Sequence, residues 1–266
     1  MKPALRLFLV LVTLAWTASQ ASAIPGRAEV TKVVGTATVS KSTGSRAPVT
    51  TGMVLGAGDT VTTDAGSTVD FNLGINGEFL HLDPDTTLSF DTLDIANVAE
   101  RKVTTQLSVP KGKVAGGIAN KLSLASKYEI RTPSGVAGIR GTKWMLVVPP
   151  GLTVQQALQR NAFNLVVTEG TVTFTPPGAT APVTVDATRG PVVYAYNTTT
   201  GQVGVQPLTG ATVVNPVTGG NTTITARKAS VITRDISAWI QQGSTPVSNI
   251  TVGTITNPAD VSTSAQ

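Results

Sequence analysis

Residues 69–90 read VDFNLGINGEFLHLDPDTTLSF, and this stretch decides the fold class. Apolar and polar residues alternate over residues 69–73, which predicts a β-strand with one buried face. The dipeptide Asn76-Gly77 favours positive φ and a tight reversal of the chain. A return strand follows at residues 79–82 and ends at Asp83-Pro84-Asp85, a typical turn sequence.

The same short, punctuated pattern continues along the chain. Further strands are predicted at 103–109, 128–131, 143–148, 164–168, 171–175 and 192–196. The chain contains 42 Thr, 26 Gly and 16 Pro among 266 residues, and only 13% are charged. β-Branched residues favour strands over helices, and a hydrophobic content of 41% is enough for a core. The sequence therefore predicts an all-β domain of many short strands, built as a sandwich, a barrel or a coil of β-turns.

Two segments break the strand pattern. Residues 153–160, TVQQALQR, begin with a threonine, a residue type that caps helices, and predict a short inserted helix. Residues 230–242 place isoleucines and a tryptophan at helical spacing, with Ser230 as the cap and Gly243 as the stop. The Thr-, Gly- and Asn-rich stretches 197–228 and 243–266 are interpreted as linker or weakly ordered.

The N-terminus has the form of a secretory signal peptide. Positive charge at Lys2 and Arg6 precedes an apolar run over residues 7–18, and Ala21-Ser22-Ala23 offers a cleavage site. Cleavage after Ala23 predicts a periplasmic or secreted protein, and it lowers the formal net charge from +5 to +3 by removing two cations. The mature chain has no apolar run long enough to span a bilayer.

This interpretation divides the chain into three parts. They are the signal peptide at 1–23, a β domain at 24–196, and a Thr/Gly/Asn-rich C-terminal region at 197–266 with a helix near 230–242. Because the chain has no cysteine, disulfides, thiol chemistry and zinc–thiolate sites are excluded.

Several segments resemble the FecR domain and follow that family's order. They are GMVLGAGDTVTT at 52–63, LHLDPDTTL at 80–88, KGKV at 111–114, IRTP at 130–133, VAGIRGT at 136–142 and VVTEGTV at 166–172. The resemblance covers roughly residues 29–175. It implies a β-rich extracytoplasmic module, solenoid- or jelly-roll-like. In its best-understood members this module belongs to an anti-sigma regulator with a cytoplasmic sigma-binding segment and a membrane helix, where this chain has the predicted signal peptide.

The motif residues also have physical interpretations of their own. Gly58-Asp59 fits a turn in which the carboxylate accepts backbone hydrogen bonds. Thr132-Pro133 requires extended backbone before the proline. In Arg140-Gly141-Thr142 the glycine indicates a bulge or a close backbone approach, and the arginine either braces nearby loops or binds an acidic ligand. Glu169-Gly170 is interpreted as a hairpin turn.

Candidate chemistry is sparse. His81 is the sole histidine, and its alternation with two leucines predicts that it faces solvent, so catalysis is not expected. The carboxylates at 83–85 and at 91 and 94 fit turn chemistry better than calcium binding. No catalytic residue, cofactor site or metal site is predicted. Lysines and arginines are scattered without aromatic residues among them, which argues against nucleic acid as a partner.

Two functions remain. The first is a non-catalytic exported FecR-like module that binds an envelope or secreted protein or another envelope component, in extracytoplasmic sensing or signalling. The second is a secreted structural or adhesive β protein, with glycan binding as one form of it. Glycan binding commonly uses an aromatic platform, and Trp144 and Trp239 are the only tryptophans after residue 23.

Overall fold

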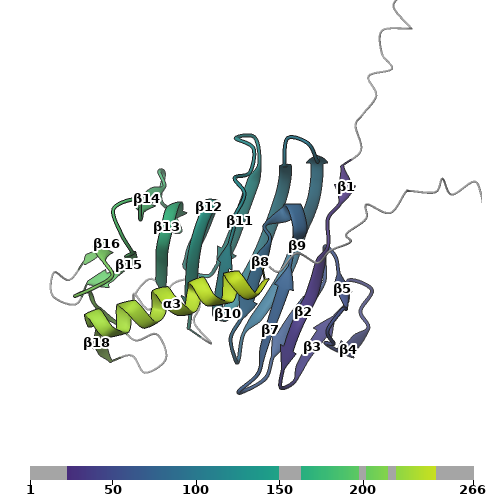
Figure 1. Cartoon of the computed structure of the whole chain (residues 1–266), viewed down its shortest axis with the longest axis horizontal. Coiled ribbons are helices and arrows are strands. Elements are labelled where there is room, and N and C mark those ends of the chain that lie inside the picture. Colours follow the sequence, from purple (N-terminus) through teal and green to yellow (C-terminus); the bar gives the residue numbers. More distant parts are fainter. Residues whose placement is uncertain (1–22, 150–162, 198–201, 215–219, 244–266) are drawn as a thin grey trace, which may run out of the picture.

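The computed structural model describes residues 23–149, 163–197, 202–214 and 220–243 (Figure 1). Strands account for most of these residues, and one α-helix lies near the C-terminal end of the described chain. The prediction of an all-β domain with a C-terminal helix is confirmed. The expected helix at 153–160 and residues 1–22 of the predicted signal peptide lie outside the described residues.

The strands form two stacked sheets. Sheet 1 contains, in spatial order, β4 (Arg46–Pro48), β3 (Ala37–Ser40), β6 (Thr60–Thr63), β9 (Thr87–Asn97), the first half of β10 (Lys102–Gly117), β11 (Lys127–Thr132), the first half of β12 (Gly135–Val148), the second half of β13 (Asn164–Thr175) and β14 (Val183–Asp186). The short β1 (Ile24–Pro25) pairs with the far end of β9. Among the described strands, only β10 and β11 pair in parallel.

Sheet 2 continues several of the same strands. It contains β5 (Val54–Leu55), β2 (Ala28–Val34), β7 (Thr68–Asn72), β8 (Phe79–Leu82), the second halves of β10 and β12, the first half of β13, β15 (Val192–Asn197) and β16 (Gln202–Pro207). A hairpin of β17 (Thr212–Val214) and β18 (Asn221–Thr223) joins the end of this sheet through β15. A 3₁₀ turn, η1 (Gly74–Asn76), connects β7 and β8.

The main hydrophobic core lies between the two sheets. Period-two alternation sends every second side chain of each strand into this space. Phe71 of sheet 2 and Phe90 of sheet 1 form an edge-to-face aromatic pair between the sheets, with ring centroids 5.5 Å apart. At the other end Phe174 of sheet 1 packs on Tyr194 of sheet 2, with centroids 5.0 Å apart. The two sheets therefore contact each other through aromatic pairs at both places, within a core that is mostly aliphatic.

Three strands pass from one sheet to the other at glycines with positive φ. β10 turns at Gly112, β12 at Gly141 and β13 at Gly170, with φ of 107°, 68° and 80°. At Gly141 the pairing of β12 with β13 shifts register, so the turn is a bulge inside a continuous strand. Such φ values are costly for any residue with a Cβ. The glycines are therefore the corners of the fold.

A helix adds a third layer on the outer side of sheet 2. α3 (Ala226–Gly243) begins four residues before the predicted start, and Thr225 accepts a hydrogen bond from the Lys228 amide as its N-cap. Ile236 and Ile240 are buried in a second hydrophobic cluster with Phe79 and other outward side chains of sheet 2. Because α3 covers this face, β8 and the second halves of β10 and β12 are buried on both sides.

Within the stretch 197–228, the described residues do not form the linker that the sequence predicted. Residues 202–207 form β16, which pairs with β15 in continuous register, and β17 and β18 follow. The high content of Thr, Gly and Asn suggested weak order. These residues instead belong to a small edge of sheet 2 that packs against the second hydrophobic cluster. Residues 244–266 lie outside the described part of the chain.

The outer side of sheet 1 differs in character from that of sheet 2. It carries mainly hydroxyl side chains, and we call this surface the hydroxyl face. Its hydroxyl residues, all partly or fully exposed, are Thr38, Ser40, Thr60, Thr62, Thr87, Ser89, Thr92, Thr104, Ser108, Thr171, Thr173, Thr175 and Thr184. Each alternates with residues that enter the main core.

The corner glycines generate a graded prediction about stability. A Cβ on Gly170 would lie 2.6 Å from the Gly141 carbonyl oxygen, whereas a Cβ on Gly178, which also has positive φ, would meet nothing within 4 Å. Gly178→Ala should therefore lower the free energy of unfolding by about 1 kcal/mol through backbone strain alone. Gly170→Ala should lower it by about 3 kcal/mol, because the close contact adds to the strain. Urea denaturation of both variants measures the difference, and equal losses would contradict the corner interpretation.

Candidate functional site

Asp59 of the Gly58-Asp59 motif is buried in the turn before β6. Its carboxylate accepts hydrogen bonds from the Ser42 and Gly56 amides, each 3.0 Å long, and forms a 2.9 Å ion pair with Lys41. Burial alone would raise the pKa of Asp59, but these bonds and the lysine charge hold the pKa below its ordinary 3.8. The Asp59 carboxylate therefore fixes the conformation of the turn, and Gly58 lies next to it with φ of 86°.

Thr132-Pro133 forms the turn between β11 and β12. The Thr132 hydroxyl donates to the Gly135 carbonyl and accepts from the Ser134 amide, at 3.0 and 3.1 Å. These bonds close a local turn of the Ser/Thr type.

Arg140, Gly141 and Thr142 lie at the corner of β12, and their side chains differ in exposure. Thr142 is buried and Arg140 is exposed. Among the described residues, the Arg140 guanidinium has no hydrogen bond or ion pair. The described contacts therefore give no sign of the bracing role. The alternative, that Arg140 binds an acidic ligand, stays a prediction.

The interpretation of Glu169-Gly170 as a hairpin turn is wrong. β13 runs without interruption from Asn164 to Thr175, so the two residues form a corner within one strand. Glu169 is well exposed and pairs with Lys143 of β12 at 2.7 Å. Positive φ and a short polar break are common to corners and hairpins, and the sequence alone does not separate them.

The described residues contain one buried ionic network, and it includes the histidine. His81 is 5% exposed, not solvent-facing as its alternation predicted. Its Nδ1 bonds to the Asp70 carboxylate, its Nε2 lies 3.3 Å from Asp83 Oδ1, and Lys113 pairs with the other oxygen of Asp83. The prediction failed because alternation assumes that one face of a strand is wet, whereas α3 covers the outer face of β8.

The network favours its charged form. Burial alone would lower the pKa of His81, but hydrogen bonds to Asp70 and Asp83 and their negative charges raise the pKa above 6.5. Burial alone would raise the pKa of Asp83, but His81 and Lys113 hold the pKa below 3.8. A protonated imidazole between two carboxylates is a poor general base, because it has no free lone pair to accept a proton.

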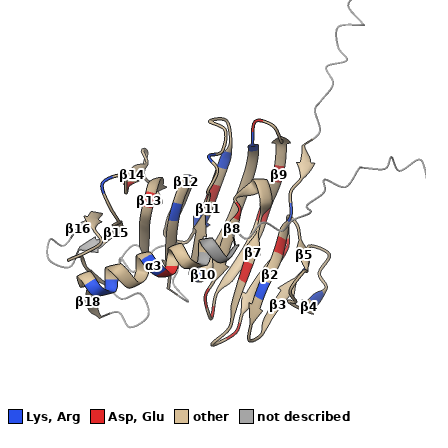
Figure 2. Cartoon of the chain, in the orientation of Figure 1, with Lys and Arg blue, Asp and Glu red and all other residues tan. Residues whose placement is uncertain are grey.

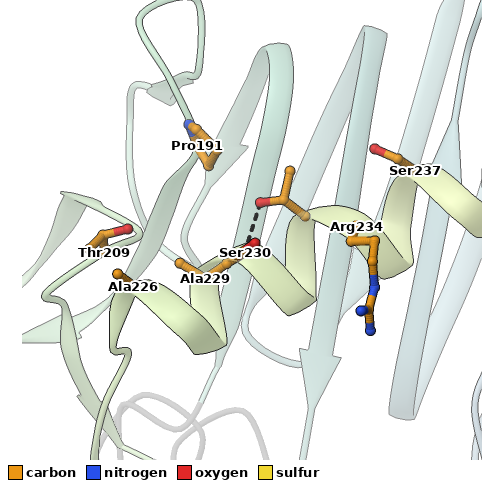
Figure 3. Close-up of a pocket in the computed structure, with 8 residues that line it drawn as sticks. Pro191, Thr209, Ala226, Ala229, Ser230, Arg234 and Ser237 are labelled. Carbon is orange, nitrogen blue, oxygen red and sulfur yellow. Dashed lines mark hydrogen bonds between the residues drawn. The ribbon is translucent and has the colours of Figure 1, made fainter.

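An open groove runs along α3. It has a volume of about 460 Å³, and the first three turns of α3 face Pro191 and Thr209 across it (Figure 3). Ser230, Thr233 and Ser237 supply hydroxyls, and Arg234 pairs with its neighbour Asp235 at 3.1 Å. The groove offers polar contacts but no nucleophile next to a base.

The described part of the chain has neither a cluster of metal ligands nor a membrane-spanning helix. No three His, Asp or Glu side chains come together there as metal ligands would. Asp83 is engaged by His81 and Lys113, and Asp91 accepts a hydrogen bond from Ser108. No helix within the described ranges has the length and apolar character to cross a bilayer.

Comparison with known proteins identifies the domain. Residues 59–173 match the family model described as FecR protein, which confirms the resemblance for that range. These residues span β6 to β13 and include all three glycine corners. No curated protein matches the chain in sequence.

Two crystal structures of a proposed anti-sigma factor from Parabacteroides distasonis are similar over part of the chain. Their sequence identities are 9% and 10%, with TM-scores of 0.38 and 0.37. Each alignment covers 56% of this chain and 59% of the crystallised protein. TM-scores this low do not establish a shared fold.

The buried network predicts that stability depends on pH above neutrality. A histidine with a raised pKa stabilises the fold fully below pH 6.5, and this contribution is lost as pH rises through its folded pKa. Asp70 and Asp83 face His81 from the sheet, and residues 236–243 of α3 include no ionisable side chain. Because the chain has a single histidine, the free energy of unfolding should fall as the pH rises above 6.5, mainly through His81.

His81→Gln should remove this slope and cost about 3 kcal/mol at pH 6, because Asp70 would keep a buried charge without its partner. Asp59→Asn is the matched control, since it removes another buried carboxylate but should keep the slope. Thermal unfolding across the pH range makes the measurement. A slope that persists in His81→Gln would show that another group titrates.

Proposed function

We propose that this chain, which carries a FecR domain at residues 59–173, is a non-catalytic exported module that acts by binding an envelope component in extracytoplasmic sensing or signalling. The family match is the observation that carries the proposal. The component is a protein or another part of the envelope.

The placement of the ionisable groups supports a binding role over a catalytic one. His81 and Asp59 are buried and engaged by neighbouring groups, and both stabilise the fold. General acid–base catalysis needs a group within hydrogen-bond reach of a substrate proton. A module that acts through its surface has no such requirement.

The export part of the proposal rests on the sequence of residues 1–23. Their charged start, apolar run and small-residue end are those of a cleavable signal. Secretion as a structural or adhesive protein is the second candidate function, and the exposed hydroxyl face favours it.

Export predicts a specific mature N-terminus. The protein recovered from the periplasm or medium of the producing cell should begin at Ile24, and intact-mass measurement tests this. Replacing Ala21 and Ala23 by large residues should block processing and retain the precursor in the membrane fraction. An unprocessed chain in the cytoplasm would overturn the export part and leave the domain assignment untouched.

Binding predicts that a crosslinker on one surface captures a discrete envelope component. A photoreactive residue replaces Thr173 on the hydroxyl face, Val231 on α3 or Val205 on β16, all of which are exposed. One position should give a distinct crosslinked species in intact cells, and the other two serve as its controls. Absence of any distinct species from all three positions would contradict the binding role.

A further inference from the structure

β16 lies at the end of sheet 2, and none of the described strands pairs with its outer edge (Figure 1). Its inner edge pairs with β15 in continuous register, residues 202–207 with residues 197–192. Asn197 of β15 pairs with Gln202 of β16 on one side and with Val213 of β17 on the other. The hairpin of β17 and β18 therefore lies on the β13 side of β15, away from the outer edge of β16.

The backbone groups of Val203 and Val205 point toward this outer edge. The Leu208 amide donates to the Pro191 carbonyl at 2.9 Å, so the backbone of Leu208 faces β15. In an antiparallel pair every second residue has its N–H and C=O groups on the same side. The other even-numbered residues of β16 therefore also face β15. The two valines present their N–H and C=O groups to the outside.

The side chains of the same two valines are exposed. Val203 is 45% exposed and Val205 is 40% exposed. Val205 lies opposite Tyr194 of β15, so it stands on the side of sheet 2 that faces the main core. Among the described strands, sheet 1 ends one strand beyond β13, at β14, whereas sheet 2 continues for two strands, β15 and β16. The valines therefore lie beyond the cover of sheet 1.

This edge lacks the features that protect free strands in other proteins. Natural edge strands carry charges or prolines, or are very short. β4 contains Arg46 and Pro48, β5 has two residues, and β14 ends at Asp186. β16 has six residues with Pro207 only at its end, and residues 190–226 of the chain contain no charged residue (Figure 2). Such an edge is open to pairing with another strand.

The sequence of β16 is self-complementary in the antiparallel direction. Residues 202–206 read QVGVQ, which is the same in both directions. When two copies pair about a two-fold axis at Gly204, Val203 of each copy lies opposite Val205 of the other. Because both valines direct their backbone groups to the shared edge, each of these two pairs exchanges both of its hydrogen bonds. The register also gathers the valines of both copies on one face and places no like charges opposite each other.

We propose that two copies of this chain associate through β16, by antiparallel pairing centred on Gly204, so that sheet 2 continues from one copy into the other. The palindrome, the direction of the valine backbone groups and the absence of charge all match a two-fold partner. An isologous contact is closed, so assembly stops at the dimer. One strand pairing buries less than a standard interface of about 1,600 Å², so the dissociation constant should be about micromolar. The inference does not depend on the proposed envelope component.

Sedimentation equilibrium of the purified protein across the micromolar range tests the inference. Val205→Lys should raise the dissociation constant at least about tenfold, because it places a hydrated charge on the shared edge. Thr184→Lys is the matched control, since Thr184 is exposed on β14, the edge strand of sheet 1 at the same end. It should leave the dissociation constant unchanged. Both positions are exposed, so neither variant should change the melting temperature.

A mixture of two variants tests the register itself. Val203→Glu alone should also weaken self-association. A mixture of Val203→Glu and Val205→Lys chains should dimerise more tightly than either variant alone, because the two-fold register places the introduced carboxylate opposite the introduced ammonium group.

A wild-type protein that stays monomeric across the micromolar range would overturn the proposal. Equal weakening by Thr184→Lys, or a mixture that associates no better than its components, would overturn it as well. If the crosslinker at Val205 captures an envelope protein and no second copy, the dimer falls and the proposed function stands.

Discussion

The fold depends on one backbone constraint: a strand that passes from one sheet to the other must turn at a sharp corner. β12 and β13 turn side by side, and a Cβ at Gly170 would lie 2.6 Å from the carbonyl oxygen of Gly141. Only glycine combines positive φ with so close an approach. Because each corner carries the chain between sheets, the pairing on one sheet fixes the pairing on the other. The aromatic contacts of the core then lie where these registers bring them.

Sequence periodicity predicted the parts of this arrangement that are local. Alternation over residues 69–73 identified β7, and the helical spacing of Ile236 and Ile240 identified α3. Periodicity carries no information about what lies beyond a strand, so it placed His81 in solvent. The covering helix is more than a hundred residues away in the chain. Burial that arises from such distant contacts is not encoded in a local pattern.

The candidate site residues show the same difference between what local sequence predicts and what distant contacts decide. The motif predicted a glycine at a bulge in β12, where local geometry decides the residue type. It did not indicate that Lys41 would meet Asp59, or that Lys113 would join the histidine network, since these pairs are formed by separate elements. The sequence around a lysine in a strand does not indicate which carboxylate it will pair with. Only the three-dimensional arrangement distinguishes paired lysines from unpaired ones.

The outer face of sheet 2 is covered by a helix and that of sheet 1 is exposed, because the outer residues of the two sheets differ. Sheet 2 presents Phe79, Ala115 and Met145, and this apolar surface is buried by α3. Sheet 1 presents hydroxyls, whose burial without partners would cost free energy, so these strands have no comparable drive to acquire a covering layer. The covering helix therefore packs on the apolar side of the sandwich, and among the described residues the hydroxyl side stays in contact with solvent.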